Sequence, residues 1–182
     1  VTRLEIGDRN VIREFATFNR GTTQDDGVTR IGSDNWIMAY VHVAHDCRVG
    51  DHVILANNVT LAGPVEIGDW AILGGFSGLH QFCRVGEHAF LGMYAALGQD
   101  VPAYCMIGGT PAQPKGINSE GLKRRGFSRE QIANIRRAYR LVYRSGLKLA
   151  EATEQLEELS ATQPELLPML ESLKFSQRGI IR

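Results

Sequence analysis

Aliphatic residues recur at every sixth position through the first half of the chain, and this spacing constrains the fold more than any other feature. The period runs without interruption through twelve positions: Ile31, Ile37, Val43, Val49, Leu55, Leu61, Ile67, Leu73, Leu79, Val85, Leu91 and Leu97. A period of six fits neither the 3.6-residue turn of an α-helix nor the alternation of a single strand, and it is a signature of parallel β-helices. We therefore expect short strands whose aliphatic side chains point inward.

A longer period, three times the first, is superposed on it. A glycine followed by an acidic or polar residue recurs at that spacing: Gly32-Ser33, Gly50-Asp51, Gly68-Asp69 and Gly86-Glu87. Three hexads therefore form one coil, which predicts a triangular prism with three strands per coil and about 4.8 Å between coils. The sequence predicts this mainly β architecture over residues 1–108.

The six-residue period continues below Ile31 with one interruption. Ile6, Ile12 and Phe18 keep it, but the interval from Ile6 to Ile31 is seven positions longer than one coil. The surplus falls in residues 20–30, where glycines and aspartates favour a loop that leaves the prism. Such a loop is either a binding element or a tolerated insertion. The chain opens in mid-period without a capping coil, so either something else covers its lower edge or, as we expect, it is a fragment of a longer protein.

The period ends after Leu97, and the remaining sequence predicts an α-helical second domain over residues 109–182. Ser128 and Gln131 form a capping box at one helix start, and Gly146 is a plausible stop for that helix. Helices are expected at about residues 119–125, 129–145, 149–161 and 165–175.

Charge and cysteine content narrow the class of protein. Residues 1–100 carry 7 basic and 12 acidic side chains, whereas residues 101–182 carry 13 and 8. The basic half suits an anionic ligand or partner, although basic helix faces are often only solvated.

No apolar run approaches the ~18 residues of a membrane span, and no secretory signal opens the chain. Three cysteines without CxxC spacing argue against a zinc site or a disulfide framework. Cys47 and Cys83, two coils apart at an inward-facing position, are expected to be buried small residues in a reducing cytoplasm.

Stacked coils convert sequence spacing into proximity. His45, Gly63 and Gln81 are each one coil apart in the sequence and are expected on one edge of the prism, with Asp46 in the adjoining column. An imidazole can act as a general base near neutral pH, and a glycine N–H can stabilise an oxyanion. The column therefore suits acyl transfer, with a solvated corner histidine as the alternative.

Other patterns are less specific. A zinc site formed by His42, His45 and His80 would need three imidazoles to converge across a subunit boundary, and their spacing is not diagnostic. No nucleophile elbow, Walker loop or dinucleotide loop is present, so an acyltransferase of this sequence would use direct attack without a covalent enzyme intermediate. A further turn column is expected to stack on the surface: His52, Trp70 and His88.

Basic residues gather at one expected helix start and along the next helix: Lys123, Arg124, Arg125, Arg129, Arg136, Arg137, Arg140 and Arg144. Guanidinium groups bind phosphate in a bidentate manner, which suits a nucleotide or a phosphopantetheine ligand. Docking of an acidic carrier protein is a second possibility, and helix faces in water are a third.

Several segments together resemble the UDP-N-acetylglucosamine acyltransferases of lipid A biosynthesis. They are Val41–Cys47, Leu55–Asn58, Leu61–Gly63, His80–Phe82, Asn118–Phe127 and Arg178–Arg182. The resemblance spans the whole chain and about the C-terminal two-thirds of the family's length. It is specific, because the helical motifs are not shared by hexapeptide acetyltransferases in general.

The resemblance implies a homotrimer of left-handed parallel β-helices with active sites between neighbouring prisms. The implied reaction is the first step of lipid A biosynthesis. In it, a (3R)-hydroxyacyl group moves from acyl carrier protein to the 3-hydroxyl of UDP-N-acetylglucosamine. No cofactor is implied beyond the phosphopantetheine of the carrier protein, and no metal, nucleic-acid partner or stable membrane insertion. A cytoplasmic location in a Gram-negative-type bacterium follows.

The resemblance also implies roles for individual residues. His45 corresponds to the general base, Asp46 to the residue that orients it, and Gly63 to the backbone donor for the oxyanion. Met93 occupies the acyl-length ruler, where glycine would leave a longer channel, so we expect a shorter acyl chain. The implied substrate contacts are His42, His80, Gln81, Asn118, Glu120, Arg124 and Arg125.

The sequence departs from the family pattern at two places. Pro64 stands where some members have a substrate-contacting histidine, so that contact is absent or supplied otherwise. The family's N-terminal coils, which carry an acid and a lysine of the pocket, are missing here, which puts activity in question even if the fold persists. Two alternatives therefore remain: a coenzyme A-dependent acetyltransferase on the same prism, and an inactive trimeric scaffold.

Overall fold

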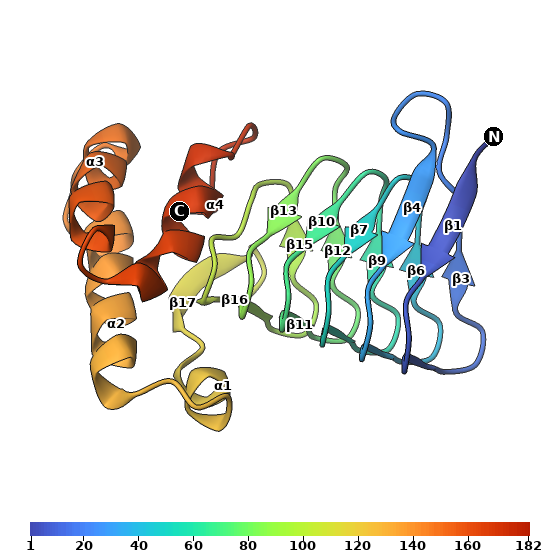
Figure 1. The fold of residues 1–182 in the computed structure, drawn as a ribbon, viewed down its shortest axis with the longest axis horizontal. Coiled ribbons are helices and arrows are strands. Elements are labelled where there is room, and N and C mark those ends of the chain that lie inside the picture. Colours follow the sequence, from blue (N-terminus) through green and yellow to red (C-terminus); the bar gives the residue numbers. More distant parts are fainter.

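The computed structural model describes residues 1–182 as a parallel β-helix followed by a helical part (Figure 1). One sheet contains β1 (Arg3–Ile6), β4 (Val28–Ile31), β7 (Arg48–Val49), β10 (Glu66–Ile67) and β13 (Arg84–Val85). The second contains β2 (Val11–Ile12), β5 (Trp36–Ile37), β8 (Ile54–Leu55), β11 (Ile72–Leu73), β14 (Phe90–Leu91), β16 (Cys105–Gly108) and β17 (Gln113–Ile117). The third contains β3 (Thr17–Phe18), β6 (His42–Val43), β9 (Thr60–Leu61), β12 (Gly78–Leu79) and β15 (Ala96–Leu97). The predicted β-helix is confirmed.

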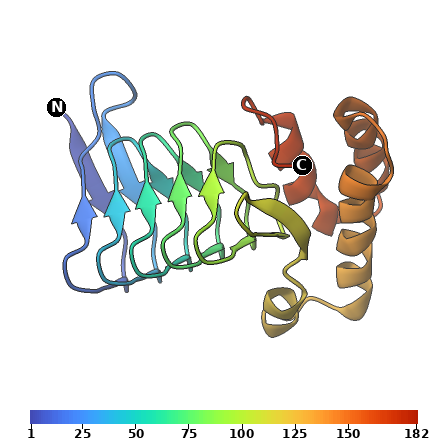
Figure 2. The ribbon, with the colours of Figure 1, turned by 180° about the vertical axis from the view of Figure 1, so that it is seen from behind.

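The strand register confirms the three-hexad coil. Val49 pairs with Ile67 in the first sheet, in parallel orientation. The lowest coil is longer by the predicted surplus, because Ile6 pairs with Ile31. The surplus forms a loop of residues 19–27 between β3 and β4, which projects beside the N-terminus in Figures 1 and 2. This loop was predicted.

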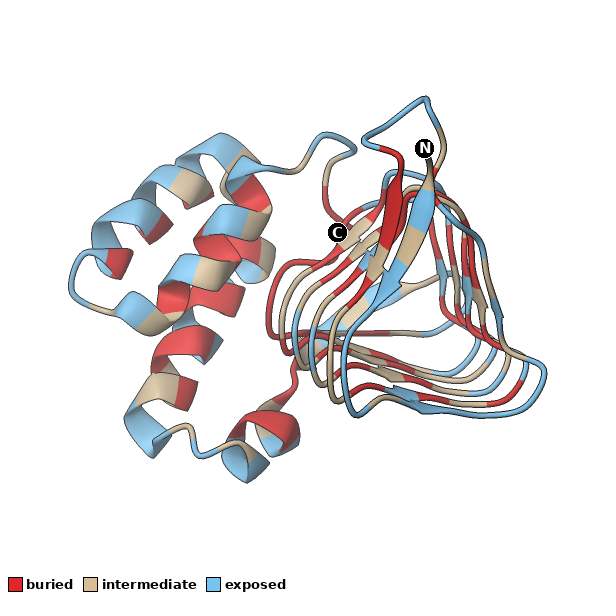
Figure 3. Ribbon diagram, turned by 45° about the vertical axis from the view of Figure 1, so that its right-hand side comes forward, coloured by how far each residue is buried: buried red, intermediate tan, exposed pale blue.

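The core fills the interior of the triangular prism (Figure 3). Ile37, Leu55 and Leu73 are fully buried, as the six-residue period predicts. Each such side chain contributes about 1.5–3 kcal/mol relative to an exposed one. Ile6 and Ile12 are exceptions, exposed at 42% and 41%, because no residue of this chain covers the lowest coil.

The turns between strands repeat one backbone conformation. In most of these turns, one residue adopts the left-handed backbone conformation, with φ between 57° and 66°. These residues are Asp34, Tyr40, Asp46, His52, Asn58, Trp70, Phe76, Phe82, His88 and Tyr94. That conformation costs roughly 1–2 kcal/mol for a residue with a Cβ. Stacking between coils offsets part of the cost, as for Phe76 and Tyr94, whose ring centres are 5.1 Å apart. Pro64 breaks the series, because its ring restricts φ to negative values.

The helical part contains α1 (Ser119–Arg124), α2 (Arg129–Arg144), α3 (Leu149–Ser160), η1 (Pro164–Leu166) and α4 (Leu167–Lys174). The expected helices are present, and the Ser128–Gln131 capping box is confirmed. Strand β17 was not predicted; it pairs antiparallel with β16 and carries the second sheet past residue 108. None of the helices combines the length and the apolar character that a membrane crossing requires.

The chain end returns to the prism. The Asp100 N–H donates to the Gly179 carbonyl oxygen at 2.9 Å, and the Ile181 N–H donates to the Asp100 carbonyl oxygen at 2.9 Å. Residues just before the chain end therefore contact the uppermost coil, close to the edge that holds Gln81.

The three cysteines are free and buried, as was predicted for Cys47 and Cys83. Burial raises the pKa of the Cys47 and Cys83 thiols to about 11 and that of Cys105 to about 12. Since the thiolate is the reactive form, these thiols act as small core residues.

Candidate functional site

A cavity of about 660 Å³ lies along the prism edge where the column of His45, Gly63 and Gln81 was expected. These three residues line it from three successive coils. Gln24 and Asp25 of the loop, which were not predicted as site residues, line the same cavity. Gln177, from the segment after α4, also reaches it. The predicted column therefore forms one wall of a concave site, and two distant segments add to it.

His45 and Asp46 form a hydrogen-bonded pair at this cavity. The His45 Nδ1 atom lies 2.8 Å from the Asp46 Oδ2 atom. The histidine side chain is 45% exposed, whereas the aspartate side chain is 2% exposed. Because a carboxylate only accepts, Nδ1–H is the donor, and Nε2 of the neutral ring is left free to take a proton. The pair has the arrangement of a general base and its orienting acid.

The Asp46 carboxylate is held by Thr22 as well as by His45. The Thr22 N–H donates to Oδ1 at 2.7 Å, and the Thr22 hydroxyl donates to Oδ2 at 2.6 Å. Burial alone would raise the pKa of the Asp46 carboxyl, but the hydrogen bonds from Thr22 and His45 outweigh it and lower the pKa below its ordinary value. Asp46 is therefore ionised and fixed. Thr22 was not predicted as a site residue, and the only sign of it in the sequence was the longer interval before Ile31.

Gly63 lies against the backbone of His45. A Cβ built on Gly63 would overlap the His45 carbonyl oxygen and lie 3.2 Å from His45 Cε1. The Gly63 N–H makes no hydrogen bond within the chain. A free backbone donor next to a candidate base is what an oxyanion site requires.

The predicted residues of α1 lie outside this cavity. Asn118 is buried; its side chain accepts from the Gly121 N–H at 3.1 Å and donates to the His88 carbonyl oxygen at 3.0 Å. It thus caps α1 and ties it to the prism. Glu120 and Arg124 are exposed, and Arg125 is half-buried. Their nucleotide contacts stay predictions, as does carrier-protein docking on the exposed arginines of α2.

His88 lies at the junction of the prism and the helical part. Its ring stacks on Trp70, with centres 6.3 Å apart, and on Tyr104 at 5.6 Å. Phe127 contacts it edge-on, and the Arg125 guanidinium donates to its Nδ1 at 3.0 Å. The prediction of surface stacking was wrong for His88, which is only 8% exposed, because residues after α1 cover it.

Burial of His88 predicts a pH-dependent stability. Desolvation, and secondarily the Arg125 charge, lower its pKa from 6.5 to about 4. The unfolded chain therefore binds more protons than the folded one between these values, so the free energy of unfolding falls as pH drops from about 6.5 towards 4. From pH 7.5 to 5 we expect a loss of roughly 2 kcal/mol from this residue.

Urea unfolding at both pH values would measure the loss, with His88→Asn as the comparison. The variant should show a correspondingly smaller difference between the two pH values. Equal differences in the two proteins would contradict the assignment.

Three other predicted residues lie away from the His45 cavity. His42 points outward from β6, with its Nδ1 2.7 Å from the Thr17 hydroxyl. His80 has its Nδ1 3.2 Å from the Gln81 carbonyl oxygen, and Met93 is 61% exposed. The histidines considered as zinc ligands are therefore not gathered with His45 in one cavity of a single chain.

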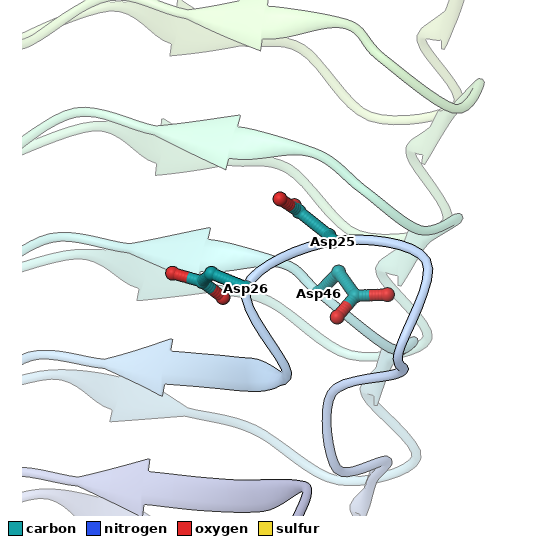
Figure 4. Close-up of side chains that lie close together, drawn as sticks. All are labelled: Asp25, Asp26 and Asp46. Carbon is teal, nitrogen blue, oxygen red and sulfur yellow. The ribbon is translucent and has the colours of Figure 1, made fainter.

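One group of acidic side chains does lie close together, at the loop (Figure 4). Ligand atoms of Asp25, Asp26 and Asp46 lie within 4.8 Å of one another. Asp26 accepts from Arg30 Nη1 at 2.6 Å and from Arg48 Nη2 at 3.1 Å. The Asp46 carboxylate accepts from Thr22 and His45. Asp26 and Asp46 therefore have hydrogen-bond partners within the chain.

Comparisons with known proteins agree with this architecture. A family model described as UDP-N-acetylglucosamine O-acyltransferase, domain 2, matches residues 100–181, and one described as bacterial transferase hexapeptide (six repeats) matches residues 29–63. The acyl-[acyl-carrier-protein]–UDP-N-acetylglucosamine O-acyltransferase of Thiobacillus denitrificans is 59% identical over 181 residues, which cover 100% of this chain and 70% of the relative.

Solved structures share this fold over nearly the whole chain. The UDP-N-acetylglucosamine O-acyltransferase of Moraxella catarrhalis superposes with a TM-score of 0.98 at 48% identity, over 100% of this chain and 71% of that one. The UDP-N-acetylglucosamine acyltransferase of Francisella novicida gives 0.97 at 47% identity, over 98% and 66%.

Proposed function

This chain belongs to the acyl-[acyl-carrier-protein]–UDP-N-acetylglucosamine O-acyltransferases of lipid A biosynthesis, and on that premise we propose how its residues carry out the transfer. The acyl donor is the acylated form of acyl carrier protein, and the acceptor is UDP-N-acetylglucosamine. We assign the donor a (3R)-hydroxyacyl group and the acceptor its 3-hydroxyl. The observation that carries the assignment is the His45–Asp46 pair facing a cavity beside the free Gly63 N–H.

The proposed reaction is a direct attack. His45 Nε2 takes the proton of the sugar 3-hydroxyl as its oxygen attacks the thioester carbonyl. The resulting oxyanion is stabilised by the Gly63 N–H, and Asp46 stabilises the imidazolium. Collapse forms the ester and breaks the C–S bond, and His45 returns the proton to the leaving thiolate of the phosphopantetheine. No other cofactor enters this scheme.

A homotrimer is proposed for the complete site. His42, Met93 and Arg124 lie outside the His45 cavity, although the resemblance assigns all three to the substrates. In a trimer, one prism could supply His45 and a neighbouring prism the other contacts. That arrangement would explain why residues outside the His45 cavity are assigned to the substrates. We also propose a cytoplasmic location, because free buried thiols such as Cys47 suit a reducing compartment.

Turnover with different donors tests the function. The protein should acylate UDP-N-acetylglucosamine with (3R)-hydroxyacyl carrier protein and show less than a hundredth of that rate with acetyl-coenzyme A. The reverse preference would instead indicate a coenzyme A-dependent acetyltransferase. Tight nucleotide-sugar binding without turnover would indicate an inactive scaffold.

Met93 provides a test of acyl-chain selection. Replacing it with glycine removes a side chain that we assign to the end of the acyl channel. We expect the preference in kcat/KM to shift by roughly tenfold or more towards donors a few carbons longer, since a pocket discriminates methylenes by about 1–3 kcal/mol. A series of carrier-protein donors of increasing length would measure the shift. A wild-type preference for the longest donor, or an unchanged preference in the variant, would contradict the assignment.

A further inference from the structure

Hydrogen bonds of Asp26 hold the C-terminal end of the loop of residues 19–27 against the prism. Asp26 accepts from the Val28 N–H at 3.0 Å and from Arg30 at 2.6 Å, next to the loop's end. It also accepts from Arg48 of β7 at 3.1 Å, which ties the loop to the next coil. The end of the loop is thus held by Arg48 of the next coil as well as by its chain connection.

The base of the loop is closed by backbone contact. The Gly21 N–H donates to the Arg3 carbonyl oxygen at 3.0 Å. A Cβ built on Gly21 would overlap the backbone of Gly27 and Val28, so only glycine allows the two ends of the loop to pass this closely. This close approach of the loop ends places the next residue, Thr22, against the His45–Asp46 pair.

Thr22 completes the set of donors around the buried carboxylate. Of the three hydrogen bonds that the Asp46 carboxylate accepts, two come from Thr22 and one from His45. The Gln24 N–H donates to the Thr22 hydroxyl oxygen at 3.3 Å, which leaves the hydroxyl proton for Asp46. Because the carboxylate is 2% exposed, water competes little with these bonds.

We propose that Thr22 is a positioning residue for acyl transfer: through Asp46 it fixes the orientation of the His45 ring towards the cavity. This rests on the proposed function of His45. The loop is then part of the catalytic apparatus and not a tolerated insertion. Its tip residues Gln24 and Asp25, which line the same cavity, are held against the base by the same contact.

Three variants of the full chain test the proposal. Thr22→Val keeps the shape and the N–H but removes the hydroxyl, and should lower kcat by roughly ten- to a hundredfold, as expected for a lost hydrogen bond to a charged group. The KM values of both substrates should stay within twofold. Thr22→Ser should restore most of kcat, and Thr23→Val, at an exposed neighbour, should have no effect. Wild-type kcat in Thr22→Val, or an equal loss in Thr22→Ser, would overturn the proposal.

A double-mutant cycle separates positioning from a general loss of structure. If Thr22 acts through Asp46, adding Thr22→Val to Asp46→Asn should cost nothing further, because residues that act as a unit are not additive. A full multiplicative loss in the double variant would mean that Thr22 acts by another route.

A measurement without substrates distinguishes a failure of this proposal from a failure of the proposed function. In ¹⁵N NMR spectra the His45 ring, assigned with His45→Gln, should show protonated Nδ1 in the wild type and a mixture of tautomers in Thr22→Val. An absence of turnover in the wild type would refute the function, while the tautomer result would still decide the role of Thr22. An unchanged tautomer in Thr22→Val would refute that role.

Discussion

Replacing His45 with alanine is expected to lower kcat roughly a thousandfold, the largest effect of any single substitution in the site. General acid–base catalysis contributes about 10²–10⁴ to a rate, and His45 is the one imidazole that lines the cavity. The fold should be unaffected, because the ring is 45% exposed and its one hydrogen bond is to Asp46. Steady-state assays with carrier-protein donor and thermal melting would measure both.

His52→Ala is the matched control for this variant. His52 occupies a turn of the same prism and stacks on Trp70, with ring centres 4.0 Å apart, but it does not line the cavity. Its replacement should leave kcat within twofold of the wild type. If the His45 variant turned over as fast as the His52 variant, His45 would not be the base.

Replacing Gly63 with alanine is the second large expected effect. The added methyl group would overlap the His45 carbonyl oxygen, so the two coils must separate locally. Crowding of this kind costs about 1–3 kcal/mol of stability. It also displaces both the base and the proposed oxyanion donor, and a misplacement of about 1 Å can lower a rate a hundredfold. We expect a lower melting temperature and a kcat reduced by roughly a hundredfold.

Gly98→Ala controls for the effect of adding a methyl group to the prism. Gly98 is exposed and a Cβ there would meet nothing within 4 Å. Melting temperature and kcat should both match the wild type. Normal stability and activity in the Gly63 variant would show that the coils relax easily at this point and that Gly63 is not a required donor.

The sequence predicted the prism because its core is periodic. A residue such as Leu73 is surrounded by its equivalents one coil before and one coil after it, so a single repeat describes its environment. The longer interval between Ile6 and Ile31 likewise predicted the loop, and the one-coil spacing predicted that His45 and Gly63 lie together. These predictions needed only counting along the chain.

The remaining features depend on contacts that no period encodes. The burial of His88 follows from Phe127 and Arg125, which reach it only after the chain has left the prism and turned back. The contact of Thr22 with Asp46 depends on the path of a loop outside the repeat. Strand β17 escaped prediction because Pro114 and Gly116, both unfavourable in strands, lie within it.

The fixed length of the coil also determines which changes of chain length the protein can accommodate. One residue inserted between His45 and Gly63, unless it leaves the coil as a loop in the way that residues 19–27 do, would turn the following aliphatic side chains out of the core and move Gly63 to a different point of the turn. A whole inserted coil would preserve the core but separate the two residues by about 4.8 Å more. A whole coil added elsewhere, above Gln81 for example, would leave both the core and this spacing unchanged. Evolution can therefore lengthen the prism only in steps of one coil, and within the catalytic edge it cannot lengthen it at all.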